Sequence, residues 1–245
     1  WLQGLLTQEV GRLEPGQGAY AAYLTPQGRM VADLRLFRRT DGFLVEAVAA
    51  VRDTLLPRLE QFVIMEDVTI ADVSETVACL TVIGPAAATA VAGCCDVAAT
   101  ALGALPEHGH VAIGASEALV AASRTHGVPA FDLFGPTDIV DAWRSDLSAR
   151  LPEASVEVLE TARIEAGRPR FGVDMHEDTI PLEAGIESRA ISFDKGCYVG
   201  QEVVIRILHR GQGRVARRLV WVEGPPSSRG CPVWAACDAV LVGDR

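Results

Sequence analysis

The segment Lys195–Glu202, with the sequence KGCYVGQE, places a thiol between two glycines. Gly196 precedes Cys197 and Gly200 follows it at a distance of three residues, so the backbone can form a tight, exposed turn there. Lys195 can stabilise the thiolate, which is the nucleophilic form of cysteine. The pattern predicts a reactive cysteine. The alternative is that Cys197 fills a small gap in the core beside a turn.

A carboxylate near the end of a predicted helix is the second candidate. Glu165 lies in the segment RIEAGRPRFGVD and faces the negative end of the helix dipole, which is locally unfavourable. The position is better explained if Glu165 meets a donor from elsewhere. A pterin offers a ring N–H and an amino N–H that one carboxylate can accept together. The alternative is an ion pair with Arg163, Arg168 or Arg170.

A third carboxylate, Asp33, lies on a predicted strand beside Ala32 and Leu34. A carboxylate that faces inward on an apolar strand is costly unless it is paired. Asp33 is therefore either a functional group in an interior site or a solvent-facing residue of simple strand alternation.

The amino-terminal elements that must position these groups alternate between strands and helices. Turn residues and apolar periodicity predict a short helix over residues 1–9, strands over 20–24, 30–37 and 43–48, a helix over 50–62, strands over 68–73 and 77–83, an Ala-rich helix up to residue 93, and a strand over 117–122. Thr25–Gly28 is a predicted turn between the first two strands. The order strand–helix–strand–strand–helix–strand is typical of a split βαβ, ferredoxin-like unit. Residues 99–114 are predicted to form a loop.

The carboxy-terminal part is predicted to begin with helices and end with strands. We expect a strand over 129–134, helices over 137–150 and 156–167, an irregular segment over 170–187, and strands over 203–208, 217–222, 233–236 and 239–242. The last four strands predict the start of a small β-barrel. The fold class is therefore α+β, with a region of two interleaved α+β subdomains over 1–205 and a partial, truncated carboxy-terminal β-barrel over 206–245.

Composition excludes some classes of protein. The 245 residues are 49% hydrophobic, too many for a disordered chain, and carry a formal net charge of −10. An acidic chain is not attracted to phosphate backbones, so we expect no direct nucleic-acid binding. One basic run contains no acid and is either a solvated strand face or an anion-binding rim: Arg206, Arg210, Arg214, Arg217 and Arg218.

The cysteines indicate a reducing compartment. Six thiols lack both the density of a secreted disulfide scaffold and the spacing of a zinc site, so no metal site is expected. Cys94 and Cys95 lie in an Ala/Val-rich run, where small buried hydrophobes are the default. No apolar run of about 18 residues predicts a membrane span. We expect a cytoplasmic protein.

Taken together, these segments resemble the YgfZ branch of the folate-dependent GcvT superfamily. The run from Arg163 to Asp174 and the run from Pro181 to Gly185 are similar to a segment shared with the glycine-cleavage T-protein, and Trp1–Val10 and Tyr20–Asp33 resemble its amino-terminal part. The signature of the branch is matched by Lys195, Gly196, Cys197, Tyr198, Gly200, Gln201 and Glu202.

The resemblance implies a ring of subdomains around a folate pocket that holds tetrahydrofolate or a one-carbon-substituted folate. Glu165 matches the pterin-binding glutamate, and Asp33 matches the second Asp of a catalytic Asp-Asp-Leu triplet whose first Asp is replaced here by Ala32. Tyr20, Arg163 and Phe171 are implied to line the cofactor site, and Cys197, Lys195 and Asp33 to act in chemistry.

The implied function is support of iron–sulfur cluster assembly or repair and of iron–sulfur-dependent tRNA modification. The implied partners are folate and iron–sulfur client or assembly proteins, with no membrane and a monomeric chain. The alternative is a folate-dependent aminomethyltransferase of the T-protein type. The T-protein lacks the Lys-Gly-Cys motif, so its reaction is not carried over together with that motif.

Overall fold

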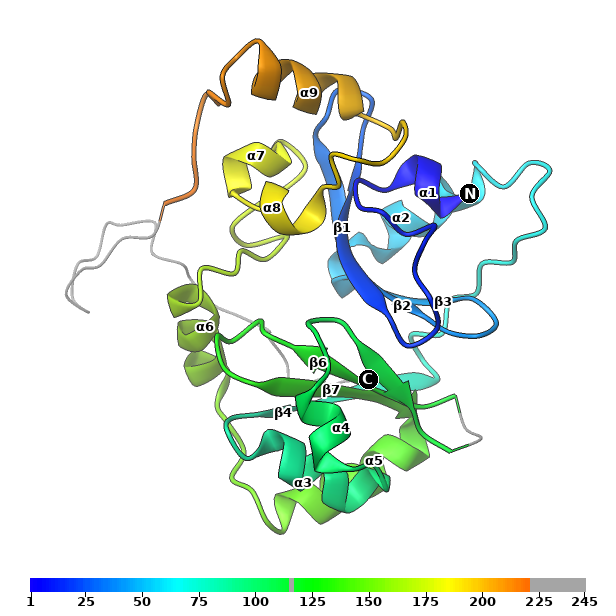
Figure 1. Cartoon of the computed structure of the whole chain (residues 1–245), viewed down its shortest axis with the longest axis vertical. Coiled ribbons are helices and arrows are strands. Elements are labelled where there is room, and N and C mark those ends of the chain that lie inside the picture. The colour runs from blue at the N-terminus through cyan, green and yellow to red at the C-terminus, as the bar shows by residue number, and fades with distance from the viewer. Residues whose placement is uncertain (115–116, 221–245) are drawn as a thin grey trace. The chain divides into compact units, whose positions relative to one another are not determined.

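The chain folds into two compact units that each combine helices with an antiparallel sheet (Figure 1). This computed structural model describes residues 1–114 and 117–220. The first unit comprises Trp1–Ile70 and the described residues from Pro169 on, and the second comprises Ala71–Arg168. The predicted α+β class is confirmed.

The sheet of the first unit is a three-stranded meander. Its strands β1 (Gly18–Leu24), β2 (Met30–Arg38) and β3 (Phe43–Glu46) pair in the order β1-β2-β3. The predicted turn between β1 and β2 is present: the Gly28 N–H donates to the Thr25 carbonyl at 2.8 Å. This hairpin turn lies against the segment that follows the cysteine motif.

Helices cover this meander. They are α1 (Leu2–Leu5), a 3-10 turn η1 (Ala49–Val51), α2 (Arg52–Glu60), α7 (Pro181–Ala184), α8 (Glu187–Ala190) and α9 (Gln201–His209). The buried core joins the strands to segments from both ends of the described chain, and includes Leu6, Leu24, Met30, Leu34, Met175, Ile186 and Val204. Burial of these apolar groups links the amino-terminal residues to the segment that carries the cysteine motif.

The second unit contains a four-stranded sheet with helices against one face (Figure 1). The strands β4 (Val77–Ile83), β5 (His110–Ala112), β6 (Leu119–Ser123) and β7 (Ala130–Pro136) pair in the order β4-β7-β6-β5. The helices against this face are α3 (Ala87–Cys95), α4 (Ala99–Gly103) and α5 (Thr137–Ser148), and α6 (Val156–Glu165) contributes no residue to their core. Its core includes Leu80, Val91, Leu102, Leu133, Val140 and Trp143.

Sheet pairing differs from the predicted split βαβ unit. The strands predicted between residues 20 and 122 belong to two separate sheets, because β1, β2 and β3 pair with one another and β4 pairs with β7. Residues 68–73 form no strand, and all six are exposed or half-buried, so no partner strand covers them. The predicted loop over 99–114 contains α4 and β5.

The predicted strand over 203–208 is wrong, because these residues lie in α9. Val204 is fully buried, and Ile207 and Leu208, three and four residues further on, pack against the same core. That spacing is the period of a helix that buries one face. The boundary at residue 206 thus falls inside α9, and residues 206–220 contain no strand. Residues 221–245, where the remaining barrel strands were predicted, lie outside the described residues. Among the described residues, no helix has the length and apolar character required to span a bilayer.

Candidate functional site

Strands β1 and β2 bring a tyrosine and a carboxylate together on one face of the meander. Ala22 pairs with Asp33 and Tyr20 pairs with Arg35, and paired residues of antiparallel strands point to the same side. Tyr20, Asp33 and Arg35 therefore share a face. The Tyr20 hydroxyl donates a hydrogen bond of 2.9 Å to Oδ2 of Asp33. The structure thus brings together two residues that the sequence proposed separately.

The pKa of the Asp33 carboxyl is shifted towards neutral pH. Desolvation raises its pKa to about 6, and the hydrogen bond from Tyr20 only partly opposes this shift. A carboxyl group that titrates near 6 can hold or release a proton close to neutral pH. The side chain is half-buried, which lies between the interior and the solvent-facing positions that the sequence left open.

Two further charged groups lie on or beside this face, and sequence reasoning missed both. The Arg189 guanidinium of α8 lies 5.1 Å from the centre of the Tyr20 ring. Arg35 forms an ion pair with Glu46 of β3. Arg35 was detectable, because its position two residues after Asp33 on a strand places it on the same face. Arg189 is distant in sequence and had no local signal.

Replacement of Asp33 by asparagine is expected to stabilise the fold at neutral pH. The folded-state pKa lies above the unfolded value, so the ionised carboxylate costs stability above pH 6 and the cost disappears as the pH falls through 6 towards 4. Asp33→Asn should add about 1–3 kcal/mol at about pH 7.5 and almost nothing at about pH 4. Urea unfolding at the two pH values measures this. Equal effects at both pH values would remove desolvation as the cause, and Asp53→Asn, a change of an exposed aspartate in α2, is the control.

The loop that carries Cys197 presents its thiol to solvent. The loop is fastened to the amino-terminal segment, since the Val199 N–H donates to the Gly4 carbonyl at 3.2 Å and the Ser192 N–H to the Thr7 carbonyl at 3.0 Å. The exposure excludes the alternative that Cys197 fills a gap in the core. A thiol that is exposed on a fixed loop is accessible to a reaction partner.

Lys195 has a different role from the predicted one. Its buried ammonium donates to the carbonyls of Gln3, Leu6 and Gln8 at 2.6, 2.7 and 2.9 Å. An ammonium has three N–H donors, so these carbonyls use all of them. Burial lowers the pKa of Lys195 to about 8, which leaves it charged at pH 7. Lys195 is therefore a staple between the motif and the amino terminus rather than a direct hydrogen-bond donor to the thiolate.

The remaining side chains of the motif also support the loop. Tyr198 is buried, burial raises its pKa to about 12, and the Lys195 ammonium lies 5.4 Å from the centre of its ring. Gln201 and Glu202 begin α9, where Glu202 pairs with Arg206 at 2.8 Å. Cys197 is thus the one motif residue that combines exposure with nucleophilic chemistry.

Two glycines allow the motif and the β1–β2 turn to touch. Gly200 has a φ of +84°, and a Cβ atom there would lie 2.6 Å from the Thr25 carbonyl oxygen. Gly28 has a φ of +75°, and its Cβ would lie 2.8 Å from Cβ of Val203. Both positions need glycine for conformation and for space. The sequence indicated a turn at Gly200 but gave no sign of its contact with the hairpin.

Alanine at Gly200 is expected to destabilise the fold, whereas alanine at Gly196 is not. The Gly200 variant must strain its backbone and displace a carbonyl, at a cost of about 1.5–3 kcal/mol. Gly196 is exposed and does not lie in the positive-φ region, and a Cβ atom added there would meet no other atom within 4 Å. Urea denaturation compares the two variants. A Gly200→Ala protein as stable as Gly196→Ala would contradict the close approach.

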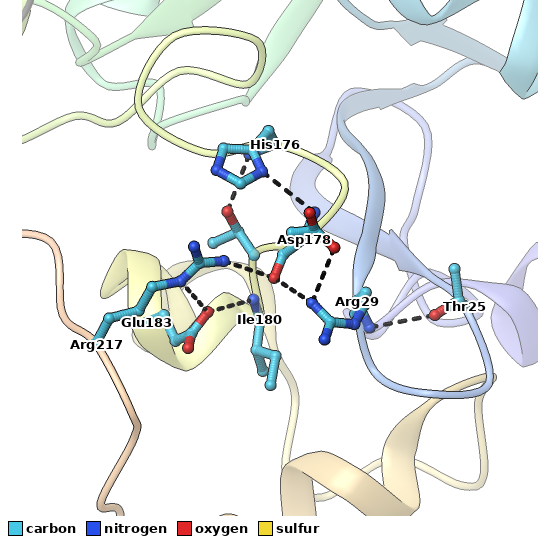
Figure 2. A network of polar contacts seen from close by, with 8 residues as sticks. Thr25, Arg29, His176, Asp178, Ile180, Glu183 and Arg217 are labelled. Carbon is cyan, nitrogen blue, oxygen red and sulfur yellow. Dashed lines mark hydrogen bonds and ion pairs between the residues drawn. The ribbon is translucent and has the colours of Figure 1, made fainter.

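The opposite side of the β1–β2 turn is held by a polar network, which Figure 2 shows. The Arg29 guanidinium donates to the Asp178 carbonyl at 2.7 Å and to its carboxylate at 3.1 Å. Arg217, beyond α9, donates to the same carbonyl at 2.6 Å and to Glu183 at 3.1 Å. This network joins the turn to the loop before α7 and to the segment after α9, so one arginine of the basic run serves as a local tether.

The second unit holds the other predicted carboxylate at the end of α6. Glu165 is exposed, and within the part of the chain that the structure describes it has no hydrogen bond or ion pair. Two of the three predicted arginine partners are engaged elsewhere: Arg163 with Glu160 and the Arg168 carbonyl, and Arg168 with Glu107 at 3.1 Å. Glu165 is therefore available to a ligand.

Arg163 and Phe171, predicted to line a cofactor site, are both buried. Arg163 is 2% exposed and donates through Nε to Glu160 at 3.1 Å. Its bond to the Arg168 carbonyl holds the turn that follows Glu165. Phe171 lies in the core of the first unit. In the structure, Arg163 supports the end of α6 and Phe171 fills the core.

Comparison with known proteins agrees with this architecture. Residues 1–195 match the family described as the GCVT N-terminal domain. The chain is 34% identical over 226 residues to an aminomethyltransferase of Rubrobacter xylanophilus, covering 91% of this chain and 59% of that protein. It is 33% identical over 237 residues to the tRNA-modifying protein YgfZ of Cronobacter sakazakii, covering 94% and 66%. The chain thus spans less than two thirds of either relative.

A solved structure shares the fold. The glycine cleavage system aminomethyltransferase T from Bartonella henselae superposes with a TM-score of 0.74 at 21% identity, over 85% of this chain and 57% of that one. The expected GcvT-like fold is confirmed. Since the family match extends over 195 of the 245 residues, this chain belongs to the GCVT N-terminal domain family.

Proposed function

We propose that this chain is a tetrahydrofolate-binding factor of the YgfZ type, which supports iron–sulfur cluster assembly or repair and iron–sulfur-dependent tRNA modification through the thiol of Cys197. The exposed thiol on its fastened loop carries the proposal. The similarity to YgfZ over 94% of the chain supports it further. Tetrahydrofolate or a one-carbon-substituted folate would be the cofactor.

The fit of the residues to a folate can be judged in each unit separately. Glu165 offers an exposed, unpaired carboxylate, which suits a bidentate contact with the pterin N–H groups. Asp33 and Tyr20 offer an acid and a hydroxyl that are already hydrogen-bonded to each other. A bound folate would carry the one-carbon unit. The protein residues would bind the folate, and Asp33 would hold a proton.

Cys197 would act on a client rather than own a cluster. An iron–sulfur cluster needs about four protein ligands, and a single thiol cannot supply them. A fixed, exposed sulfur can serve as one ligand or nucleophile while the partner protein supplies the rest. This proposal places the cysteine at the client and the carboxylates at the cofactor.

An aminomethyltransferase reaction is the second candidate, because the pKa of Asp33 is raised to about 6 and several relatives carry that name. The two functions differ in product. Incubation of the protein with tetrahydrofolate and an aminomethyl-lipoyl carrier should release ammonia only if the second candidate is correct.

Loss of the Glu165 carboxylate is expected to weaken folate binding. Glu165→Ala should cost about 1.5–3 kcal/mol, the range of a hydrogen bond to a charged group, which is roughly a 10- to 100-fold rise in Kd. Titration calorimetry with tetrahydrofolate measures it. Glu157→Ala, an exposed glutamate in the first turn of the same helix, is the matched control. Equal affinity of the two variants would remove Glu165 from the site, and no heat from the unmutated protein would reject folate binding.

A further inference from the structure

Two adjacent cysteines, which the proposed function does not use, end helix α3 in the second unit. Cys94 and Cys95 are the last residues of the helix, and Asp96 stops it in the left-handed region with a φ of +51°. Neighbouring side chains on a helix normally diverge. Here the two sulfur atoms converge to 3.5 Å.

The two thiols have unequal surroundings. Cys94 is half-buried and its Sγ–H can donate to the Val91 carbonyl at 3.3 Å, whereas Cys95 is 3% exposed. The hydrogen bond from Cys95 lowers the pKa of Cys94, and the same contact together with burial raises the pKa of Cys95. Cys94 is thus the thiol that loses its proton more readily.

A cation lies against the same turn. Gly93 has no side chain, and a Cβ atom there would meet Nη1 of Arg150 at 3.1 Å. The guanidinium, paired with Asp146, therefore covers the backbone next to Cys94. The guanidinium favours the thiolate of Cys94, but the Asp146 carboxylate opposes it with a larger effect, so the lowered pKa of Cys94 comes first from the hydrogen bond with Cys95.

Direct oxidation of the pair to a disulfide is disfavoured by geometry. Adjacent Cα atoms lie about 3.8 Å apart across a trans peptide, below the range of about 4.4–6.8 Å that disulfides require. The described residues contain no cis peptide bond. A single arsenic or metal atom that bridges the two sulfurs does not require a sulfur–sulfur bond. It can therefore bind while α3 keeps its helical end.

We propose that Cys94 and Cys95 form a bidentate site for a soft, thiophilic acceptor, either trivalent arsenic or a soft metal ion. Thiolate sulfur is the protein ligand that selects such acceptors. With an arsenical of the form R–As(OH)₂, each S–H bond is replaced by an S–As bond, and each hydroxyl leaves with the thiol proton as water. Arsenic stays trivalent, so the step needs no oxidant. With a metal ion, the two thiol protons pass to solvent.

Phenylarsine oxide is the probe for binding of trivalent arsenic, and Cd²⁺ is the probe for binding of a soft metal ion. The test protein carries Cys197→Ser, Cys231→Ser and Cys237→Ser, so that no other exposed or undescribed thiol competes. Native mass spectrometry should detect one phenylarsenic group with the loss of two protons, and peptide mapping should place it on residues 94 and 95. Cd²⁺ should produce thiolate–metal absorption in the ultraviolet if metals also bind.

Removal of one thiol separates chelation from single-site reaction. Cys94→Ser in the same background should weaken phenylarsine oxide binding by about 100-fold or more, since the second bond is intramolecular only when both thiols are present. Cys95→Ala should do the same, and circular dichroism verifies that each variant is folded. Should Cys95→Ala unfold, the half-buried Cys94→Ser variant decides alone. An undiminished adduct in Cys94→Ser, or attachment to Cys79, would overturn the proposal.

Discussion

Replacement of Cys197 by serine is expected to abolish support of iron–sulfur-dependent tRNA modification while leaving the fold and folate affinity intact. The Cys197 side chain is exposed, and its sulfur makes no hydrogen bond within the part of the chain that the structure describes. Exposed substitutions of this kind usually change stability by less than about 0.5 kcal/mol. A serine hydroxyl at neutral pH is neither a thiolate nor a soft ligand, so the chemical function is lost although the shape is kept.

Complementation measures this loss directly. Cells that lack their own YgfZ-type protein would receive either this protein or the variant, and mass spectrometry of tRNA nucleosides would report the cluster-dependent modification. Asp194→Ser is the matched control, because Asp194 is an exposed residue of the same loop outside the motif and the new residue is the same. Full modification with Cys197→Ser would reject a thiol role. Loss in both variants would point to the loop and not to the sulfur.

The folate affinity of the Cys197→Ser protein tests whether the role of the thiol is separate from folate binding. Calorimetry should give the same Kd as for the unmutated chain, since the proposed cofactor groups are carboxylates on β2 and at the end of α6. A large rise in Kd would mean that the thiol belongs to the cofactor site. The thiol would then be part of cofactor chemistry, and the client contact would have to lie elsewhere.

Local sequence signals predicted much of the fold because most elements obey a simple period. The Thr25–Gly28 turn and the strands on both sides of it followed from Pro, Gly and alternation, and α5 and α6 followed from helical spacing. Such features depend on neighbours in sequence. Strand partners do not, which is why the alternation of strands and helices suggested one split sheet where the chain builds two.

Helix α9 illustrates how packing overrides propensity. Its run of Val203, Val204 and Ile205 favours a strand on β-branched residues alone. The core of the first unit instead accepts Val204 and Ile207 on one helical face, while Gly200 starts the helix in a conformation that only glycine adopts readily. The signal for a helix was present in the 204, 207, 208 spacing, but a short apolar run allows both periods.

In the candidate site, too, some features depend on neighbouring residues and others on residues far away in the sequence. The residue types within one turn predicted a tight turn around Cys197 and favoured an exposed thiol, although a buried Cys197 remained the alternative. The partner of Lys195 could not be predicted in this way, because its three acceptors are backbone carbonyls nearly two hundred residues earlier in the chain. Backbone carbonyls have no sequence signature. Sequence reasoning therefore paired Lys195 with the nearby thiol of Cys197. In the fold, Lys195 instead donates to carbonyls of the amino-terminal segment.

Replacement of Lys195 by methionine is expected to be the most destabilising change in the motif. Methionine keeps the apolar stem but leaves the carbonyls of Gln3, Leu6 and Gln8 without their common donor. An unsatisfied buried acceptor costs about 1–3 kcal/mol, and water can reach the Gln3 and Gln8 segments only in part, so the expected loss is about 3–5 kcal/mol. Urea unfolding measures it, with Arg210→Met, an exposed cation after α9, as the control.

The same variant separates a staple from a thiolate partner. If Lys195 acts only by fastening the loop, the rate of Cys197 alkylation by iodoacetamide should keep the same dependence on pH in Lys195→Met, measured where the variant is still folded. Its absolute rate can rise, because the loop is less restrained. A displaced pH dependence with unchanged stability would instead make Lys195 an electrostatic partner of the thiol. A direct hydrogen bond from the ammonium to the thiolate would require one of the three carbonyls to lose its donor, since these carbonyls already use all three donors.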